Sequence, residues 1–149
     1  MKIYSVTERQ KKNSIIAEED FETDYLESVN NPKKFWKEKA EATLDWFSNW
    51  DEVASSNLEE GKVEWFKNGK LNACFNCVDR HLKSHSNKTA IIWEGDDPKD
   101  TKKISFEELH KNVCKFANLL KSRKIKKGDR VCIYMPMIPE AAYAMLACA

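Results

Sequence analysis

Two cysteines and two histidines follow one another closely as Cys74, Cys77, His81 and His85, in the spacing C-x2-C-x3-H-x3-H. Thiolate and imidazole are the usual ligands of zinc, which binds four ligands at about 2.0–2.3 Å. The surrounding sequence predicts a single helix, on which Cys74 and His85 would lie about 16 Å apart along the axis. A straight helix offers a metal only two neighbouring ligands. We therefore expect packed thiols and partly exposed imidazoles here, and no metal ligands.

The same cysteines form the motif Cys74-Phe75-Asn76-Cys77 at the expected start of this helix. A C-x-x-C motif in that position can carry redox chemistry, because a helix start favours the thiolate. A thioredoxin-like site follows a strand of a βαβ unit, whereas only a short extended piece and a turn are predicted before this motif. We therefore interpret these cysteines as structural.

A basic run extends over Lys121–Arg130 and reads KSRKIKKGDR. Such a run could bind the phosphates of a nucleic acid or of a nucleotide cofactor. Cations at the end of a helix, followed by a solvated turn, explain the run without a ligand. No aromatic residues are interleaved with it to stack on bases. The run is interpreted as a solvated surface.

The usual signatures of catalysis are missing from the sequence. Its four glycines stand far apart, so there is no glycine-rich phosphate loop. No nucleophile-elbow motif occurs, and no pair of carboxylates can be assigned to a cleft. We therefore predict no catalytic residue, no cofactor-binding residue and no metal ligand within these 149 residues.

Composition narrows the class of protein further. A net charge of +1 with 33% charged residues gives no global field that favours nucleic acid or a membrane. No apolar stretch approaches the roughly 18 residues of a membrane helix, and the amino terminus has no hydrophobic signal core. An odd number of cysteines, five, without a secretory context indicates reduced thiols in a cytoplasmic compartment.

The sequence of the first half of the chain predicts helices and an aromatic surface. Residues 1–20 are polar and are expected to form a loosely held arm, and 18–28 a short helix. Asn31-Pro32 predicts the cap and first position of a second helix. Its apolar stripe continues as an aromatic face over residues 35–50, which is typical of core or of a docking surface. Residues 51–62 are interpreted as loop, residues 63–66 as a short extended piece, and residues 68–69 as a turn.

The second half predicts mixed structure. Asn72 is expected to cap a helix over 73–83, and antiparallel strands are expected over 89–94 and from residue 104. Ser105 and Glu108 form a capping box before an amphipathic helix. The apolar run 131–135 predicts a strand buried on both faces, and Pro139 the first position of a helix covered on most sides. This strand–helix pair is the first half of a βαβ unit, so the fold class is α/β. We expect the chain to be the front part of a longer protein.

Four strings of the sequence resemble the amino-terminal portion of AMP-forming acetyl-CoA synthetases, of the adenylate-forming superfamily. They are VEWFKNGKLNACFNCVDRHL (63–82), AIIWEGDDP (90–98), ISFEELH (104–110) and KGDRVCIYMPMIPEAAYAMLACA (127–149). The resemblance implies a flexible arm at 1–19, a helical and irregular wrapping region at 20–88, and the start of the α/β adenylation domain at 89–149. The WEGD string is more similar to the acetyl enzyme than to its propionyl relative.

Such enzymes convert acetate, ATP and CoA into acetyl-CoA, AMP and pyrophosphate through an acetyl-adenylate, with Mg²⁺ accompanying the ATP. The resemblance places their phosphate loop, acetate pocket, ribose-binding aspartate and catalytic lysine beyond residue 149. This portion alone is therefore predicted to be inactive. Asp79, Arg80 and His81 are interpreted as a buried ion pair or cap that anchors the wrapping region. The alternatives are a fragment of a propionyl-CoA synthetase or a free-standing interaction module that uses the 35–50 face.

Overall fold

The computed structural model describes residues 4–149 and divides the chain into two compact units. The first unit comprises the residues up to Asp45 together with 49–69. The second comprises 46–48 and 70–149. The domain boundaries inferred from sequence, at 19/20 and 88/89, stay predictions.

The first unit opens with a short helix in the region expected to be an arm. Helix α1 (Glu8–Asn13) has Thr7 as its N-cap. The Thr7 hydroxyl accepts a hydrogen bond from the backbone N–H of Gln10, whose side chain accepts in turn from Thr7 N. This capping box satisfies two backbone N–H donors at the N-terminal end of the helix. None of the residues of α1 is buried, so the helix depends on local interactions.

Two further helices follow, α2 (Glu18–Asn30) and α3 (Pro32–Thr43). The predicted helix at 18–28 and the helix start at Pro32 are confirmed. Asn31 is the N-cap residue as predicted, but its side chain donates to Glu27 Oε2 (3.0 Å) and makes no capping hydrogen bond. The aromatic stripe also ends earlier than expected. The backbone becomes extended at Leu44, and Ser48 then pairs with Lys70.

A β-hairpin completes the first unit. Strand β1 (Glu52–Asn57) pairs antiparallel with β2 (Lys62–Lys67), with Ala54 opposite Trp65. The prediction of loop over 51–62 is therefore wrong, while the extended piece at 63–66 is confirmed. The segment EVASSN has little apolar character of its own, so its partner strand determines its conformation. The turn at Asn68-Gly69 is confirmed, with Asn68 at φ 62°.

The second unit begins with a broken helix. In place of one helix over 73–83, the chain forms α4 (Ala73–Cys77), the 3₁₀ turn η1 (Asp79–His81) and α5 (Leu82–His85). The break lies at Val78, whose φ and ψ of −127° and −65° leave the helical region. The predicted cap is confirmed, because Asn72 Oδ1 accepts from Phe75 N at 2.8 Å.

A second hairpin leads directly into the longest helix. Strands β3 (Thr89–Glu94) and β4 (Thr101–Ser105) are antiparallel, as predicted. Ser105 ends β4 and also caps α6 (Phe106–Ser122), so no loop separates strand from helix. The predicted capping box is confirmed: Ser105 Oγ accepts from Glu108 N at 3.2 Å, and Glu108 Oε2 accepts from Ser105 N at 2.9 Å.

The apolar run 131–135 forms no strand, and this prediction is wrong. Among residues 4–149 the strands pair only within the two hairpins, so no parallel neighbour is available to it. Its side chains are exposed, Tyr134 completely. Two residues beyond the run, Met137 O accepts a hydrogen bond from Trp93 Nε1 (2.6 Å).

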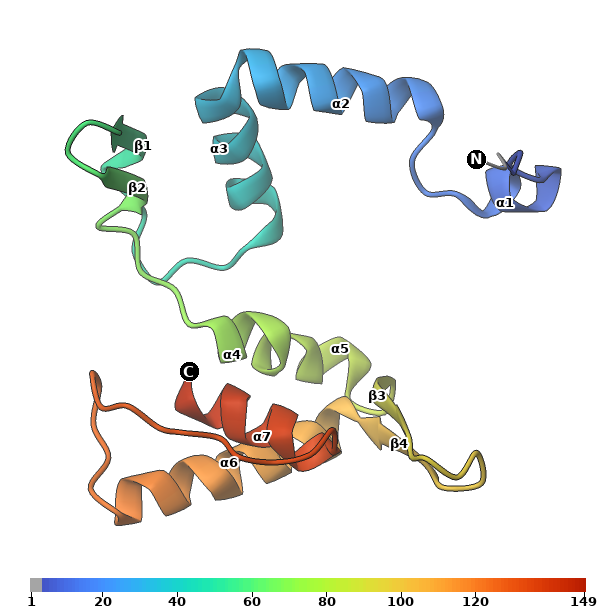
Figure 1. Cartoon of the computed structure of the whole chain (residues 1–149), viewed down its shortest axis with the longest axis vertical. Helices are drawn as coiled ribbons and strands as arrows, with labels where there is room; N and C mark the ends of the chain where they lie inside the picture. Colours follow the sequence, from blue (N-terminus) through green and yellow to red (C-terminus); the bar gives the residue numbers. More distant parts are fainter. Residues whose placement is uncertain (1–3) are drawn as a thin grey trace. The chain divides into compact units, whose positions relative to one another are not determined.

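Helix α7 (Pro139–Cys148) starts at Pro139 as predicted. Pro139 and Ala144 are buried, Glu140, Met145 and Cys148 are exposed, and the other side chains of the helix are partly exposed. The expectation of a helix buried around most of its circumference is therefore met only in part. Figure 1 shows α7 lying beside α6, and the two helices are in contact.

The core of the second unit is small. It consists of the buried residues Val78, Ile104, Leu109 and Val113, with Cys74 and Leu146 packed at its border. Val78 has no exposed surface. The structure is thus a mixed assembly of helices with two antiparallel hairpins, within the predicted α/β class. In the described part of the chain, no helix is both long and apolar enough to cross a membrane.

The β3–β4 hairpin offers a matched test of this core. Ile104 is 8% exposed and Ile92 is 66% exposed. Substitution Ile104→Ala should lower the free energy of unfolding by about 2–5 kcal/mol, because it removes buried methyl groups and leaves a cavity. Ile92→Ala should cost less than about 1 kcal/mol, since it loses only strand preference. Denaturant unfolding of both variants checks this, and equal losses would contradict the assigned core.

The capping box gives a second prediction. Ser105→Ala should destabilise the second unit by about 1 kcal/mol, because α6 loses a side-chain acceptor at its N-terminus. At the other end of α6, Ser122 Oγ donates to Leu119 O and caps no free N–H group, so Ser122→Ala should change stability by less than about 0.5 kcal/mol. Denaturant unfolding of the two serine variants gives the comparison. A larger effect at Ser122 would contradict the assigned role of Ser105.

The same box makes stability depend on pH. Hydrogen bonds from the backbone and then the hydroxyl of Ser105 hold the pKa of Glu108 below its ordinary value. The stabilisation is therefore complete above the unfolded-state pKa and is lost as pH falls through the lower folded-state pKa. Glu108→Gln lacks this titration. The difference in unfolding free energy between the wild type and Glu108→Gln should thus decrease as the pH is lowered from 7 to 3. A difference that does not change with pH would argue against the assigned role of Glu108 in the capping box.

Candidate functional site

The structure separates the two cysteines and two histidines that the sequence spacing had grouped. Cys74 and Cys77 belong to α4, whereas His81 ends η1 and His85 ends α5. The expectation that one straight helix carries all four is wrong, because the chain breaks at Val78. Within residues 4–149, no three His, Cys, Asp or Glu side chains are grouped so that they could hold a metal ion.

The imidazole rings of His81 and His85 contact each other and the side chains of Phe106 and Ser84. Their ring centroids lie 6.0 Å apart, and the His81 ring also packs against Phe106 at 5.3 Å. His85 Nδ1 forms a hydrogen bond of 2.7 Å with Ser84 Oγ. The ring contacts of His81 connect η1 with α5 and with the start of α6, which is a structural role.

Another group of side chains does come together. We call Cys74, Asp79, His110 and Cys114 the thiol–imidazole cluster. Cys74 Sγ donates to Asp79 Oδ2 at 3.8 Å, and Asp79 Oδ1 lies 3.4 Å from His110 Nε2. Cys114 Sγ is also 3.4 Å from His110 Nε2. The cluster joins α4 and η1 to α6, and its side chains line a depression of about 390 Å³.

The environment of Cys74 opposes ionisation. Burial, followed by the negative charge of Asp79, raises the pKa of its thiol to about 11. Cys74 is therefore a neutral thiol at physiological pH and serves as a hydrogen-bond donor. This excludes Cys74 as the activated thiol of a C-x-x-C redox site, because such a thiol needs a lowered pKa.

The Asp79-Arg80-His81 string acts as an anchor. Asp79 Oδ1 lies 3.4 Å from His110 Nε2, a contact that is an ion pair only when the imidazole is protonated, and both side chains are 35% exposed, so the contact is not the buried ion pair that was predicted. Arg80 Nη1 donates to Asn76 Oδ1 at 2.9 Å, which ties η1 to α4. Because these contacts connect neighbouring elements of one unit, they support an anchoring role.

The basic run Lys121–Arg130 lies wholly at the surface. Lys121 is in the last turn of α6, and Arg123 is the C-cap. A turn follows, in which Asp129 Oδ2 accepts from Lys126 N at 2.8 Å and Gly128 has φ 96°. This geometry agrees with cations at a helix end followed by a solvated turn.

The aromatic face predicted over 35–50 does not form one helical surface. Phe35 and Trp36 pack edge to face within α3, with ring centroids 5.1 Å apart. Phe47 belongs to the second unit and contacts Phe75 at 5.6 Å. The interaction module considered from sequence would have needed a continuous helical face, and α3 ends at Thr43.

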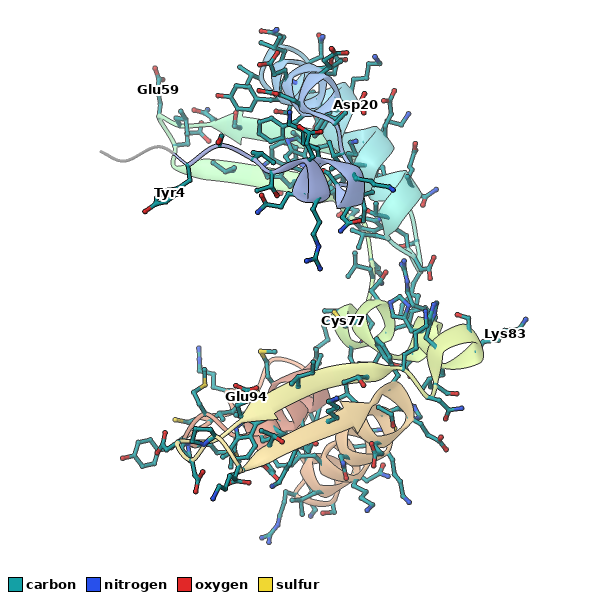
Figure 2. All side chains as sticks on the ribbon, turned by 90° about the vertical axis from the view of Figure 1, so that its right-hand side faces the viewer. Tyr4, Asp20, Glu59, Cys77, Lys83 and Glu94 are labelled. Atoms are coloured by element: carbon teal, nitrogen blue, oxygen red, sulfur yellow. The ribbon has the colours of Figure 1, made fainter. Side chains whose placement is uncertain are left out.

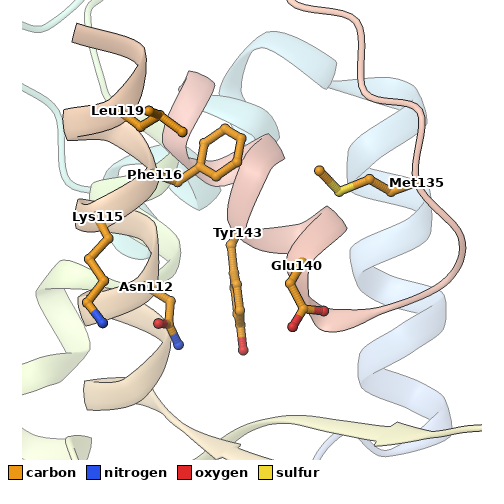
Figure 3. Close-up of a pocket in the computed structure, with 7 residues that line it drawn as sticks. All are labelled: Asn112, Lys115, Phe116, Leu119, Met135, Glu140 and Tyr143. Carbon is orange, nitrogen blue, oxygen red and sulfur yellow. The ribbon is translucent and has the colours of Figure 1, made fainter. Parts of the chain in front are cut away.

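A larger groove of about 470 Å³ lies between α6 and α7 (Figure 3). It is lined by Asn112, Lys115, Phe116, Leu119, Met135, Glu140 and Tyr143. Its polar tips gather at one end and its apolar side chains at the other, as Figure 3 shows. Burial and then the charge of Glu140 raise the pKa of Tyr143, so its hydroxyl stays protonated. The groove suits apolar side chains with a polar edge and contains no activated nucleophile.

Sequence reasoning missed His110 and Cys114. They stand four residues apart on α6, so helical spacing alone places them on one face. Their connection to Asp79 depends on how η1 packs against α6, which no local pattern shows. Cys77, which Figure 2 labels on α4, is exposed.

Residues 21–149 match the models of two known protein families. Residues 21–77 match the family described as "Acetyl-coenzyme A synthetase N-terminus", and residues 78–149 match the family described as "AMP-binding enzyme". The junction between the two matches falls at Val78, where α4 ends.

Curated relatives agree with both matches. The chain is 54% identical over 147 residues to the acetyl-coenzyme A synthetase of Alcanivorax borkumensis, covering 99% of this chain and 23% of that protein. It is 50% identical to acetyl-coenzyme A synthetase 2 of Pseudomonas aeruginosa with the same coverage. The chain thus spans about a quarter of the length of these relatives.

A solved structure shares the arrangement of the elements. The acetoacetyl-CoA synthetase from Streptomyces lividans superposes with a TM-score of 0.72 at 26% identity. The match covers 81% of this chain and 18% of that structure. Taken together, the matches show that this chain belongs to the acetyl-coenzyme A synthetase family of AMP-binding enzymes and corresponds to its amino-terminal portion.

Proposed function

We propose that the chain is the amino-terminal portion of an enzyme that forms acetyl-CoA from acetate, ATP and CoA through an acetyl-adenylate. The observation that carries this proposal is 47–54% identity over 99% of the chain to proteins named acetyl-coenzyme A synthetase. The 147 aligned residues extend over both units. The proposed products are acetyl-CoA, AMP and pyrophosphate.

The cofactors follow from the chemistry of the proposed reaction. An acyl-adenylate forms when a carboxylate attacks the α-phosphate of ATP, and the developing charge needs a cation such as Mg²⁺ beside the phosphates. CoA then accepts the acetyl group through its thiol. We assign acetate, ATP, Mg²⁺ and CoA to the whole enzyme and none of them to residues of this portion. A cytoplasmic location is part of the proposal, and five cysteines without a disulfide support it.

The role proposed for this portion itself is architectural. Two sites contain groups that could carry chemistry, the thiol–imidazole cluster and the α6–α7 groove. Neither site is formed by a glycine-rich loop of the kind that binds the phosphates of ATP. The uncovered side chains of 131–138 and the apolar end of the groove suit burial beneath further elements of an α/β domain. Each buried large apolar side chain contributes on the order of 1.5–3 kcal/mol, so such cover would bind this portion firmly.

A chimera tests the proposal. Residues 1–149 would replace the corresponding segment of the Alcanivorax borkumensis relative, which is 54% identical. We expect the chimera to retain acetate-dependent exchange of labelled pyrophosphate into ATP within about tenfold of the parent, which corresponds to a loss of about 1.4 kcal/mol or less in transition-state stabilisation. The 149-residue chain alone should give no exchange above a protein-free control.

Three controls make the result decisive. Ile104→Ala in the chimera should lower its thermal stability more than Ile92→Ala, which shows that the transplanted portion is folded. Propionate in place of acetate tests the alternative acyl group, and faster exchange with propionate would favour a propionyl-CoA synthetase. Exchange by the isolated chain would contradict the architectural role. A folded but inactive chimera would contradict the proposed function.

A further inference from the structure

Hydrogen bonds are formed on either side of the run 131–135 but not within it. In the turn before the run, Asp129 Oδ2 accepts from Lys126 N at 2.8 Å. After the run, Met137 O accepts from Trp93 Nε1 at 2.6 Å. In the part of the chain that the structure describes, no backbone hydrogen bond involves the residues of the run itself. Their backbone N–H and C=O groups are therefore free to pair with another strand.

The residues of this run alternate in exposure, as they do along a strand. Val131, Ile133 and Met135 are 36%, 39% and 41% exposed, and Met135 lines the α6–α7 groove. Tyr134 is completely exposed, and Cys132 is exposed as well. A period of two places odd-numbered side chains on one face of an extended chain and even-numbered side chains on the other. One face of the run is thus already partly covered, while its other face and its backbone edge are open.

We propose that the run 131–135 is a docking edge for an extended apolar segment of the same enzyme, which follows α7 in the longer protein and pairs with the run in parallel. This inference rests on the proposed function, because it needs the longer protein of which this chain would be the amino-terminal portion. The curated relatives have the necessary length. The chain covers 23% of the Alcanivorax borkumensis protein, and its match to an amino-terminal family leaves the remainder on the carboxyl-terminal side.

The course of the chain determines the direction of the partner. Figure 1 shows that the chain reverses between the run and α7, which begins at Pro139. Helix α7 has 10 residues and is about 15 Å long, close to the roughly 17 Å of a five-residue strand. A segment that follows α7 therefore starts level with the beginning of the run and continues parallel to it, as in a βαβ crossover. A second copy of the chain, related by a two-fold axis, would instead pair antiparallel.

The open surface determines the chemistry of the partner. No Asp, Glu, Lys or Arg occurs in residues 131–138. Phe116 and Leu119 lie in the same groove as Met135 and continue its apolar surface. A strand without charge on either face belongs to the interior of a sheet, because an exposed apolar edge promotes aggregation. The partner segment must therefore also carry apolar side chains on both of its faces.

Hydrogen exchange measured by mass spectrometry tests whether the edge becomes covered. The 149-residue chain would be compared with the chimera that joins it to the remainder of the Alcanivorax borkumensis protein. In the isolated chain the amides of 131–135 should exchange rapidly. In the chimera they should slow by about 100-fold or more, because each then opens only with the sheet that contains it. Rapid exchange of these amides in the folded chimera would overturn the proposal.

The exposed thiol of Cys132 identifies the partner and its direction. In the chimera, single cysteines would be placed in turn along the segment that follows α7, and disulfides with Cys132 mapped after mild oxidation; Cys132→Ser is the control. We expect one main position, with weaker cross-linking two residues to either side, because only alternate side chains share a face. The double variant Cys132→Ser/Tyr134→Cys should shift that position by two residues toward the carboxyl terminus. A shift toward the amino terminus, or no cross-link at all, would overturn the proposal.

Another occupant would give a different result. If protection of 131–135 in the isolated chain rises with protein concentration together with a dimer mass, the partner is a second copy and the proposal is overturned. Neither measurement requires catalysis, so the docking edge and the proposed function are tested separately. An inactive chimera with protected 131–135 amides would contradict only the function. An active chimera in which these amides exchange rapidly would contradict only the docking edge.

Discussion

The complete burial of Val78 is the constraint around which the second unit is organised. A valine side chain with no exposed surface requires cover from several directions, and here it comes from the β3–β4 hairpin and α6 through Ile104, Leu109 and Val113. The backbone leaves the helical region at this residue, so that α4 and η1 both pack against the same core. The break brings Asp79 toward α6, where it meets His110. The core and the thiol–imidazole cluster are therefore two consequences of one local departure from helical geometry.

Local sequence signals predicted those elements whose stability is local. The capping box of Ser105 and Glu108, the cap at Asn72 and the first helical position at Pro139 all depend on side chains within four residues, and all three are found as predicted. The spacing of apolar residues identified α6 for the same reason, since a 3.6-residue period needs no knowledge of the partner surface.

The failures share a different cause, which is dependence on distant residues. Strand β1 has a weak pattern and exists because β2 pairs with it. The run 131–135 has a strong strand pattern but finds no parallel partner among residues 4–149. The helix over 73–83 breaks because burying Val78 outweighs the local preference for a continuous helix. His110 and Cys114 could be paired from sequence, whereas their link to Asp79 requires the tertiary packing. The active-site residues of the family could not be placed, because the matched relatives are about four times longer than this chain.

Native-state hydrogen exchange tests the central claim most directly. Val78 N donates to Cys74 O at 2.8 Å, so its amide exchanges only when the core around it opens. We expect this amide to share one opening free energy with the central amides of α6, and the amides of 131–135 to exchange rapidly, since no strand covers them. Protection of 131–135 equal to that of α6, or rapid exchange at Val78, would contradict a unit organised around this buried valine.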